Sequence, residues 1–100
     1  MILVRNIFRM KFGQAKPAVA AFQEVRTVMK QHGLKSSRLL TDLVGTSYTL
    51  IHEIEFDSLT AFEQEMKKIT GSGEWRARYE AFMPFCESGS REMYNVVPEP

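Results

Sequence analysis

The feature that most restricts the fold is the order in which alternating and helical segments follow one another. Residues 2–10 (ILVRNIFRM) and 48–56 (YTLIHEIEF) alternate apolar and polar side chains, as half-buried strands do. Residues 17–33 and 59–69 instead space their apolar side chains three and four positions apart, which is typical of amphipathic helices. A strand, a helix, a strand and a second helix are therefore predicted from these segments alone.

Two further strands and a short helix complete the order. The segment SSRLLTDLV (36–44) is predicted to be a strand, joined by the turn GTS to residues 48–56 in a hairpin. Ser72 is placed to cap a short helix that ends at Pro84, because proline cannot continue a helix. After the loop CESGS, residues 91–97 (REMYNVV) are predicted to form the last strand.

This β-α-β-β-α(α)-β order predicts an α+β fold of the ferredoxin-like kind. Right-handed crossovers make such a chain a four-stranded antiparallel sheet with all helices on one face, and the first and third strands are its central neighbours. A length of 100 residues suits one core. We expect one domain over residues 1–97, followed by a frayed tail at 98–100.

Charge argues against nucleic acid as a partner. The net charge is +1, whereas phosphate binding needs a surplus of Lys and Arg on one face. RNA-recognition domains share this element order, but their third strand carries basic and aromatic residues that contact RNA. Here that strand places Glu53 and Glu55 on its outer face, where carboxylates repel phosphate.

Two further properties indicate where the chain works. No apolar run approaches the roughly 20 residues that span a bilayer, and Arg5 interrupts the N-terminal apolar run too early for a signal peptide. Cys86 is the only cysteine, so no internal disulfide can form. We therefore expect no membrane partner and a cytoplasmic location, with Cys86 as a structural thiol.

The sheet face opposite the helices mixes apolar and charged side chains. It is too apolar to leave to water and too charged for a dry core, so a second copy of the sheet is expected to cover it. A solvated face with scattered aliphatic residues is the alternative. The residues predicted on this face are Leu3, Arg5, Ile7, Arg9, Ile51, Glu53 and Glu55.

A histidine stands on the apolar, helix-facing row of residues 48–56. His52 and Asn6 fall on adjacent central strands, below the helix that carries Trp75 and Tyr79. An amide, an imidazole and a phenol around an apolar cavity could orient a small aromatic or polyketide-like substrate and stabilise an enolate. His52 and Asn6 are the catalytic candidates: a buried, neutral His52 could take a proton from a phenolic substrate while Asn6 holds the resulting oxyanion. Trp75 and Tyr79 are expected to bind the substrate. The alternative is a packed core in which these groups bond one another.

No metal or cofactor motif is present. The two histidines, His32 and His52, lie far apart, no cysteine cluster exists, and no glycine series forms a phosphate-binding loop. His32 precedes the helix-ending Gly33, where an imidazolium suits the helix dipole. We therefore expect neither a metal nor a cofactor.

The element order, the mixed second face and the stretch from "FDSLTAFEQEM" through "EWRARYEAFMPF" to "REMYNVV" resemble the dimeric α/β-barrel superfamily. Within it, the chain is most similar to NIPSNAP-type and antibiotic-biosynthesis-monooxygenase-type proteins. The resemblance implies that two ferredoxin-like sheets face each other and close a barrel, so that the partner is a second copy of the chain.

The resemblance also allows a test for haem. Monooxygenases of the superfamily use an Asn on the first strand, and Asn6 occupies a comparable position. Haem-degrading members add a Trp and an iron-ligating His on later helices, and these positions fall near Glu65 and Tyr79 here. Two of three positions differ, so haem degradation is not expected.

Two functions stay open. The first is a cofactor-independent monooxygenase or isomerase acting on a small aromatic or polyketide-like substrate. The second is a non-catalytic ligand-binding or assembly module of NIPSNAP type, with no enzymatic activity. The superfamily contains both, so fold alone does not decide between them.

Overall fold

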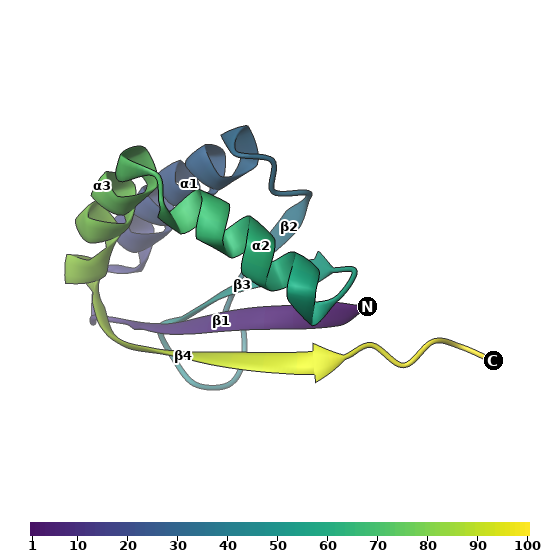
Figure 1. The fold of residues 1–100 in the computed structure, drawn as a ribbon. Helices are drawn as coiled ribbons and strands as arrows, with labels where there is room; N and C mark the ends of the chain where they lie inside the picture. Colours follow the sequence, from purple (N-terminus) through teal and green to yellow (C-terminus); the bar gives the residue numbers. More distant parts are fainter.

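The computed structural model describes all residues, 1–100, and contains one four-stranded antiparallel sheet. Its strands lie in the order β2-β3-β1-β4, so β1 and β3 are the central neighbours, as predicted (Figure 1). The strands are β1 (Ile2–Met10), β2 (Ser37–Thr41), β3 (Thr49–Phe56) and β4 (Cys86–Asn95).

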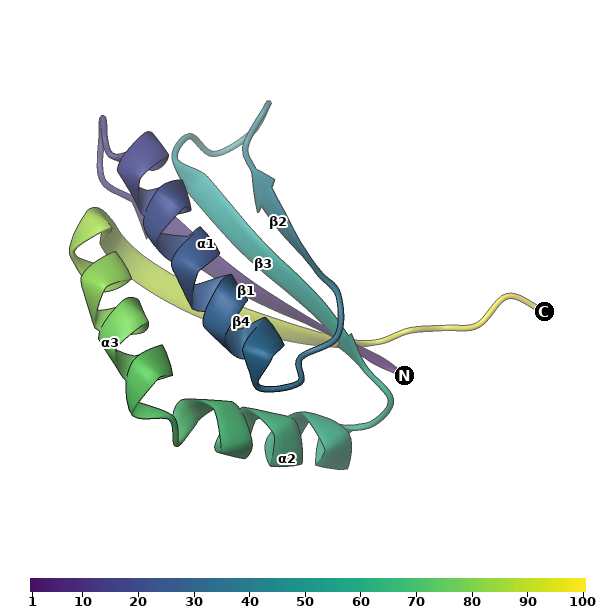
Figure 2. The same ribbon diagram turned by 90° about the horizontal axis from the view of Figure 1, so that it is seen from above.

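The helices lie on one face of the sheet (Figure 1). They are α1 (Ala15–Gln31), α2 (Leu59–Thr70) and α3 (Gly73–Phe82), followed by the 3₁₀ turn η1 (Met83–Phe85). Figure 2 shows α1 running along the middle of the sheet, α3 beside it, and α2 crossing beyond the end of α1. This arrangement confirms the predicted ferredoxin-like α+β fold.

Serine side chains cap the starts of α2 and α3. Ser58 Oγ accepts a hydrogen bond from the Ala61 amide at 3.1 Å, and Ser72 Oγ accepts one from the Trp75 amide at 3.3 Å. Each cap satisfies an amide that the first turn of a helix leaves unpaired. The second cap starts α3 in a new direction directly after α2 ends, so the chain bends between the two helices (Figure 2).

The core lies between the helices and the sheet. Apolar residues of the helix-facing rows pack against α1 and against the ends of α2 and α3. Phe8, Phe22 and Phe82 meet edge to face or tilted, with ring centroids 4.9–5.5 Å apart. The least exposed apolar side chains are Val4, Ala18, Val25, Leu50, Ile54, Ile69 and Phe82.

Two predicted strand boundaries were wrong. The last strand begins at Cys86 rather than 91, because the polar segment CESGS pairs with β1 instead of forming a loop. Gly89 lowers the strand signal of this segment, yet a Cβ there would lie 3.2 Å from Phe8 Cδ1, so glycine leaves room for that ring. The second strand ends at Thr41 rather than 44, and the apolar side chains of Leu43 and Val44 are exposed.

Met1 and Val96, each near one end of the chain, lie next to each other. The Val96 amide donates a hydrogen bond to the Met1 carbonyl at 3.0 Å, and residues 96–100 form neither helix nor strand. Figure 1 shows this C-terminal segment extending away from the sheet. The domain limits of 1–97 and the frayed tail at 98–100 stay predictions.

One row of charges crosses the sheet on the face without helices. Arg38, Glu53, Arg5 and Glu92 stand opposite one another on β2, β3, β1 and β4. Glu53 accepts a hydrogen bond from Arg38, and its other oxygen lies 3.0 Å from Arg5 Nε. The neighbouring row, Leu40, Ile51 and Ile7, is apolar and half-buried. Part of the predicted mixture on this face is therefore ordered into separate rows, although Leu3 stands opposite Glu55.

None of the α-helices combines the length and the apolar character that crossing a bilayer requires.

Candidate functional site

A cavity of about 450 Å³ lies inside the bend between α2 and α3. Its floor is formed by β1, β3 and β4, and its walls by α1, Met66 of α2 and the first turns of α3. The four residues singled out in the sequence all line it, namely Asn6, His52, Trp75 and Tyr79. Phe22, which could have filled this space, forms part of the wall instead.

His52 is held below the surface by two contacts. Its side chain is 1% exposed, Nε2 lies 2.9 Å from Ser37 Oγ, and its ring meets Phe22 edge to face at 5.0 Å. The contact with Ser37 is made by Nε2 and does not involve Nδ1. One ring nitrogen of a residue that lines the cavity is thus tied to Ser37 of the neighbouring strand.

Burial, and to a smaller extent the positive charge of Arg26, together lower the pKa of His52 to about 4. Both causes oppose the imidazolium, first by removing its hydration and then by like-charge repulsion. His52 is therefore neutral at pH 7, as the sequence predicted. Arg26 acts at short range, because its Nε donates to the same Ser37 Oγ at 3.3 Å.

Asn6 stands between His52 and Arg91 in the strand register. Its Oδ1 accepts a hydrogen bond from Arg91 Nε at 2.7 Å, which is short for a charge-assisted bond and fixes the amide. The guanidinium also lies over the Phe62 ring, 5.4 Å from its centroid. Asn6 therefore keeps its NH₂ group free to donate, and Arg91 brings a positive charge to the cavity lining.

Sequence reasoning missed Arg91. Arg91 is the first residue of the predicted last strand, and its partner on the first strand depends on the register. Once β4 pairs antiparallel with β1, Arg91 falls opposite Asn6 on the helix-facing row. Arg91 therefore lies in one row with Asn6 and His52, and all three line the same cavity.

The aromatic wall comes from α3. Trp75 and Tyr79 stack with centroids 4.9 Å apart and planes 15° from parallel. Trp75 Nε1 is buried and has no hydrogen-bond partner. Burial raises the pKa of the Tyr79 hydroxyl, the charge of Cys86 adds to this, and Arg91 opposes it. Tyr79 is thus a neutral phenol at pH 7, and Trp75 supplies an unused donor.

The side chains here do not fit a haem or a metal. No group of three or more His, Cys, Asp or Glu side chains is arranged to hold a metal ion. Glu65, at the position compared with the haem-associated Trp, lines a different groove beside β3. Tyr79, at the position compared with the iron ligand, keeps its proton because burial raises its pKa. The cavity instead offers neutral hydrogen-bonding groups, stacked rings and one guanidinium.

The sequence matches no known family model and no curated protein. Solved structures do match. A NIPSNAP domain protein from Burkholderia xenovorans is 17% identical with a TM-score of 0.83, over 99% of this chain and 95% of that one. A NIPSNAP family protein from Agrobacterium tumefaciens is 16% identical with a TM-score of 0.85, over 96% and 85%.

A second group of structures is similar over nearly the same length. A putative antibiotic biosynthesis monooxygenase from Chloroflexus aurantiacus is 14% identical with a TM-score of 0.75, over 99% of this chain and 95% of that one. At such identities the likeness concerns the backbone. The chain has the ferredoxin-like fold shared by NIPSNAP domain proteins and antibiotic biosynthesis monooxygenases.

Proposed function

We propose that this protein binds a small aromatic or polyketide-like molecule in the cavity inside the α2–α3 bend. The observation that carries the proposal is the division of the lining into two chemistries. Trp75, Tyr79 and Phe22 supply rings, whereas Asn6 and Arg91 supply donors from the strands. A volume of about 450 Å³ lies within the range of ligand sites, roughly 300–1,000 Å³.

The donors favour a ligand that carries an acidic oxygen. The guanidinium of Arg91 and the NH₂ group of Asn6 can both hydrogen-bond a phenolate or an enolate, and they are already fixed to each other. Preorganised donors stabilise developing negative charge more than water does, because they need no reorganisation. In this proposal Arg91 and Asn6 hold the oxyanion while the α3 rings stack on the ligand.

His52 fits a hydrogen-bonding role better than the proton-abstracting role suggested by the sequence. A base works best when its pKa lies near the operating pH, and that of His52 is lowered to about 4. A phenol, with a pKa near 10 in tyrosine, would give up its proton only rarely to such a weak base. We propose that His52 donates from Nε2 to Ser37 and accepts a hydrogen bond from the ligand at Nδ1.

Cofactor-independent monooxygenation or isomerisation is the reaction class that we propose for this site. Both reactions pass through a resonance-stabilised anion of the substrate. The substrate would lose its proton to water on binding, and Arg91 and Asn6 would stabilise the anion. Non-catalytic ligand binding is the second candidate, and the low basicity of His52 favours it. The fold also occurs among NIPSNAP domain proteins, so both candidates have structural relatives.

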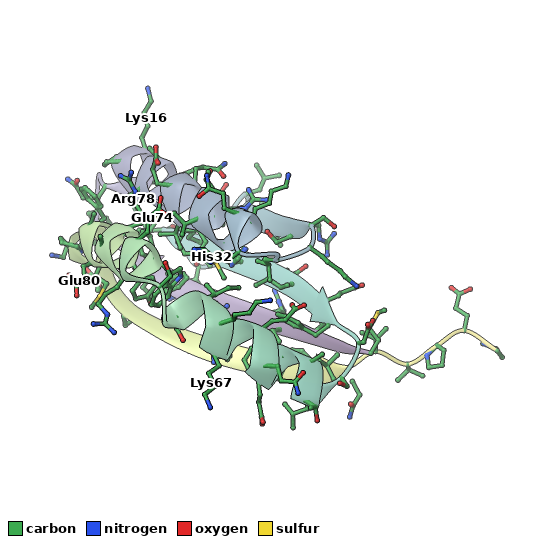
Figure 3. The ribbon with its side chains drawn as sticks, turned by 45° about the horizontal axis from the view of Figure 1, so that its top comes forward. Lys16, His32, Lys67, Glu74, Arg78 and Glu80 are labelled. Carbon is green, nitrogen blue, oxygen red and sulfur yellow. The ribbon has the colours of Figure 1, made fainter.

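Fluorescence gives a direct test, because Trp75 is the only tryptophan. Quinols and hydroxylated polycyclic aromatics should quench its emission saturably, while an oxygen electrode follows turnover. Replacing Arg91 by Gln should weaken binding at least about tenfold, as expected for one charge-assisted hydrogen bond. Arg78→Gln is the matched control, since Arg78 is exposed on α3 and lies outside the cavity lining (Figure 3).

The outcomes separate the candidates. Saturable quenching with oxygen uptake supports the enzyme, and quenching without uptake supports the binding module. No saturable quenching by any compound, or equal losses in the Arg91 and Arg78 variants, would contradict the proposed site.

We further propose that a second copy of the chain covers the open sheet face. Leu40, Ile51 and Ile7 form an apolar row there, and the adjoining charge row contains two Arg and two Glu residues. Such a row carries no net charge, so two copies can face each other without repulsion. The lone Cys86 supports a reducing compartment, and we propose the cytoplasm.

A further inference from the structure

A second, basic groove lies on the outer side of α1. It has a volume of about 300 Å³ and runs between α1 and the segment 34–37 that leads into β2. Arg26 and Lys30 line it from the helix, and Lys35, Ser36 and Ser37 line it from the segment. No carboxylate lines this groove. It differs in this respect from the other grooves along β2, which are lined by Asp42 or Glu53.

The cations of the groove have no acidic partners. Arg26 hydrogen-bonds only neutral groups, namely Gln23 Oε1 at 3.0 Å, the Ser37 carbonyl at 2.9 Å and Ser37 Oγ at 3.3 Å. None of Arg26, Lys30 and Lys35 forms an ion pair. The C-terminal end of α1 adds roughly half a negative charge nearby, which three unit cations outweigh. The groove therefore keeps an uncompensated positive charge.

We propose that this groove binds the phosphate group of a small molecule. A guanidinium fixed by neutral partners, two lysines and the Ser36 hydroxyl provide the charge and the donors that phosphate oxygens require. The groove on the opposite side of the segment shares residues 35–37 but differs in charge, because Arg38 and four carboxylates complete its lining, namely those of Glu53, Glu55, Asp57 and Glu65. An anion is thus attracted to one side of residues 35–37 and repelled from the other.

The groove is connected to the cavity through Ser37. Ser37 Oγ lies 3.3 Å from Arg26 Nε on the groove side and 2.9 Å from His52 Nε2 on the cavity side. Arg26 repels the His52 imidazolium, so a phosphate bound at Arg26 would offset that repulsion. Occupancy of the groove should therefore make His52 easier to protonate, which gives the site a readout independent of any activity.

The experiment uses inorganic phosphate as the probe. A titration at low salt should shift the backbone amide resonances of residues 35–37 saturably in an NMR spectrum, and it should move the His52 ring titration to higher pH. The variant Lys30→Gln/Lys35→Gln should lower the affinity for phosphate about tenfold or more, because it removes two charged donors. Lys16→Gln/Lys67→Gln removes the same charge from two exposed lysines outside the groove and should bind like wild type (Figure 3).

The source of the phosphate group is distinguished by two further probes. Glycerol phosphate tests a free phosphomonoester, and phosphatidylcholine vesicles containing phosphatidic acid test a lipid headgroup. Binding of either supports the site. Failure of wild type to saturate with inorganic phosphate, or equal weakening in the two double variants, would overturn the proposal.

Discussion

Glu53 Oε2 lies 3.0 Å from Arg5 Nε, directly across the β3–β1 register on the face that no helix covers. The Arg5 N–H does not point at this oxygen, so the contact is an ion pair without a hydrogen bond. The Glu53 side chain is 8% exposed, although Arg38 on its other side is 72% exposed. A carboxylate this shielded from water needs its two cations to offset the cost of burying its charge. Of the four residues in the charge row, Glu53 is therefore the one whose replacement should affect stability most.

Replacing Glu53 by Gln should destabilise the fold by about 1–3 kcal/mol, because Arg5 loses its closest countercharge while the shape is kept. Urea unfolding at pH 7 measures this loss. Glu92→Gln is the matched control: Glu92 lies 3.6 Å from Arg5, its side chain is 44% exposed, and its loss should cost less than about 1 kcal/mol. Equal costs for the two variants would contradict the central role given to Glu53.

The double variant Ile7→Asp/Ile51→Asp should convert a dimer into monomers or unfold it. Ile7 and Ile51 face each other across β1 and β3 on the open face, and each buried aliphatic side chain contributes about 1.5–3 kcal/mol. Light scattering at micromolar concentration measures the mass, and circular dichroism separates dissociation from unfolding. Val97→Asp is the control, because Val97 is 84% exposed outside the sheet. A wild-type mass near 11.5 kDa would refute the dimer.

The fold could be predicted because its signals are local. Alternation in residues 2–10 and 48–56, and the serine cap at 72, depend on neighbours in the chain, and the structure has these elements where the sequence placed them. The start of β4 could not be predicted, because Gly89 belongs to that strand for a tertiary reason, the Phe8 ring beside it. The end of β2 was predicted too late for the opposite reason. Leu43 and Val44 are apolar residues of an exposed loop, and in the sequence they resemble the continuation of a strand.

The candidate site was predicted in part. His52 and Asn6 could be placed together because residues on one row of adjacent strands meet, and strand order followed from topology. Ser37, Arg26 and Arg91 could not be found without the register, which brings each against a residue distant in the chain. Nor does a pattern reveal how far burial lowers the pKa of His52, which changed its expected role from base to hydrogen-bond acceptor.

Replacing Trp75 by Phe should separate the role of the indole N–H from that of the ring. Trp75 Nε1 is a buried donor without a partner, and such a group costs about 1–3 kcal/mol. Losing it should offset the lost packing area, so the free energy of unfolding should change by less than about 1 kcal/mol. Ligand affinity, measured by calorimetry, should fall if the ligand accepts from this N–H. A large loss of stability would show that the indole is structural.

The stability of the protein should rise with pH between about 4 and 6.5, partly because of His52. The pKa of its imidazole is lowered from 6.5 to about 4 in the folded protein, so in this range the unfolded chain binds a proton that the folded protein does not. Proton uptake by the unfolded state favours unfolding. The contribution of His52 to the free energy of unfolding is therefore complete above pH 6.5. It falls by up to about 3 kcal/mol as the pH drops toward 4.

Urea unfolding of wild type and His52→Gln at pH 7 and pH 4.5 isolates this contribution, because the carboxylates titrate in both proteins. Glutamine can still hydrogen-bond Ser37, so stability at pH 7 should change little, while the loss on acidification should be smaller than in wild type. Parallel pH profiles for wild type and His52→Gln would mean that His52 is protonated in the folded state. Its neutral hydrogen-bonding role in the cavity would then be wrong.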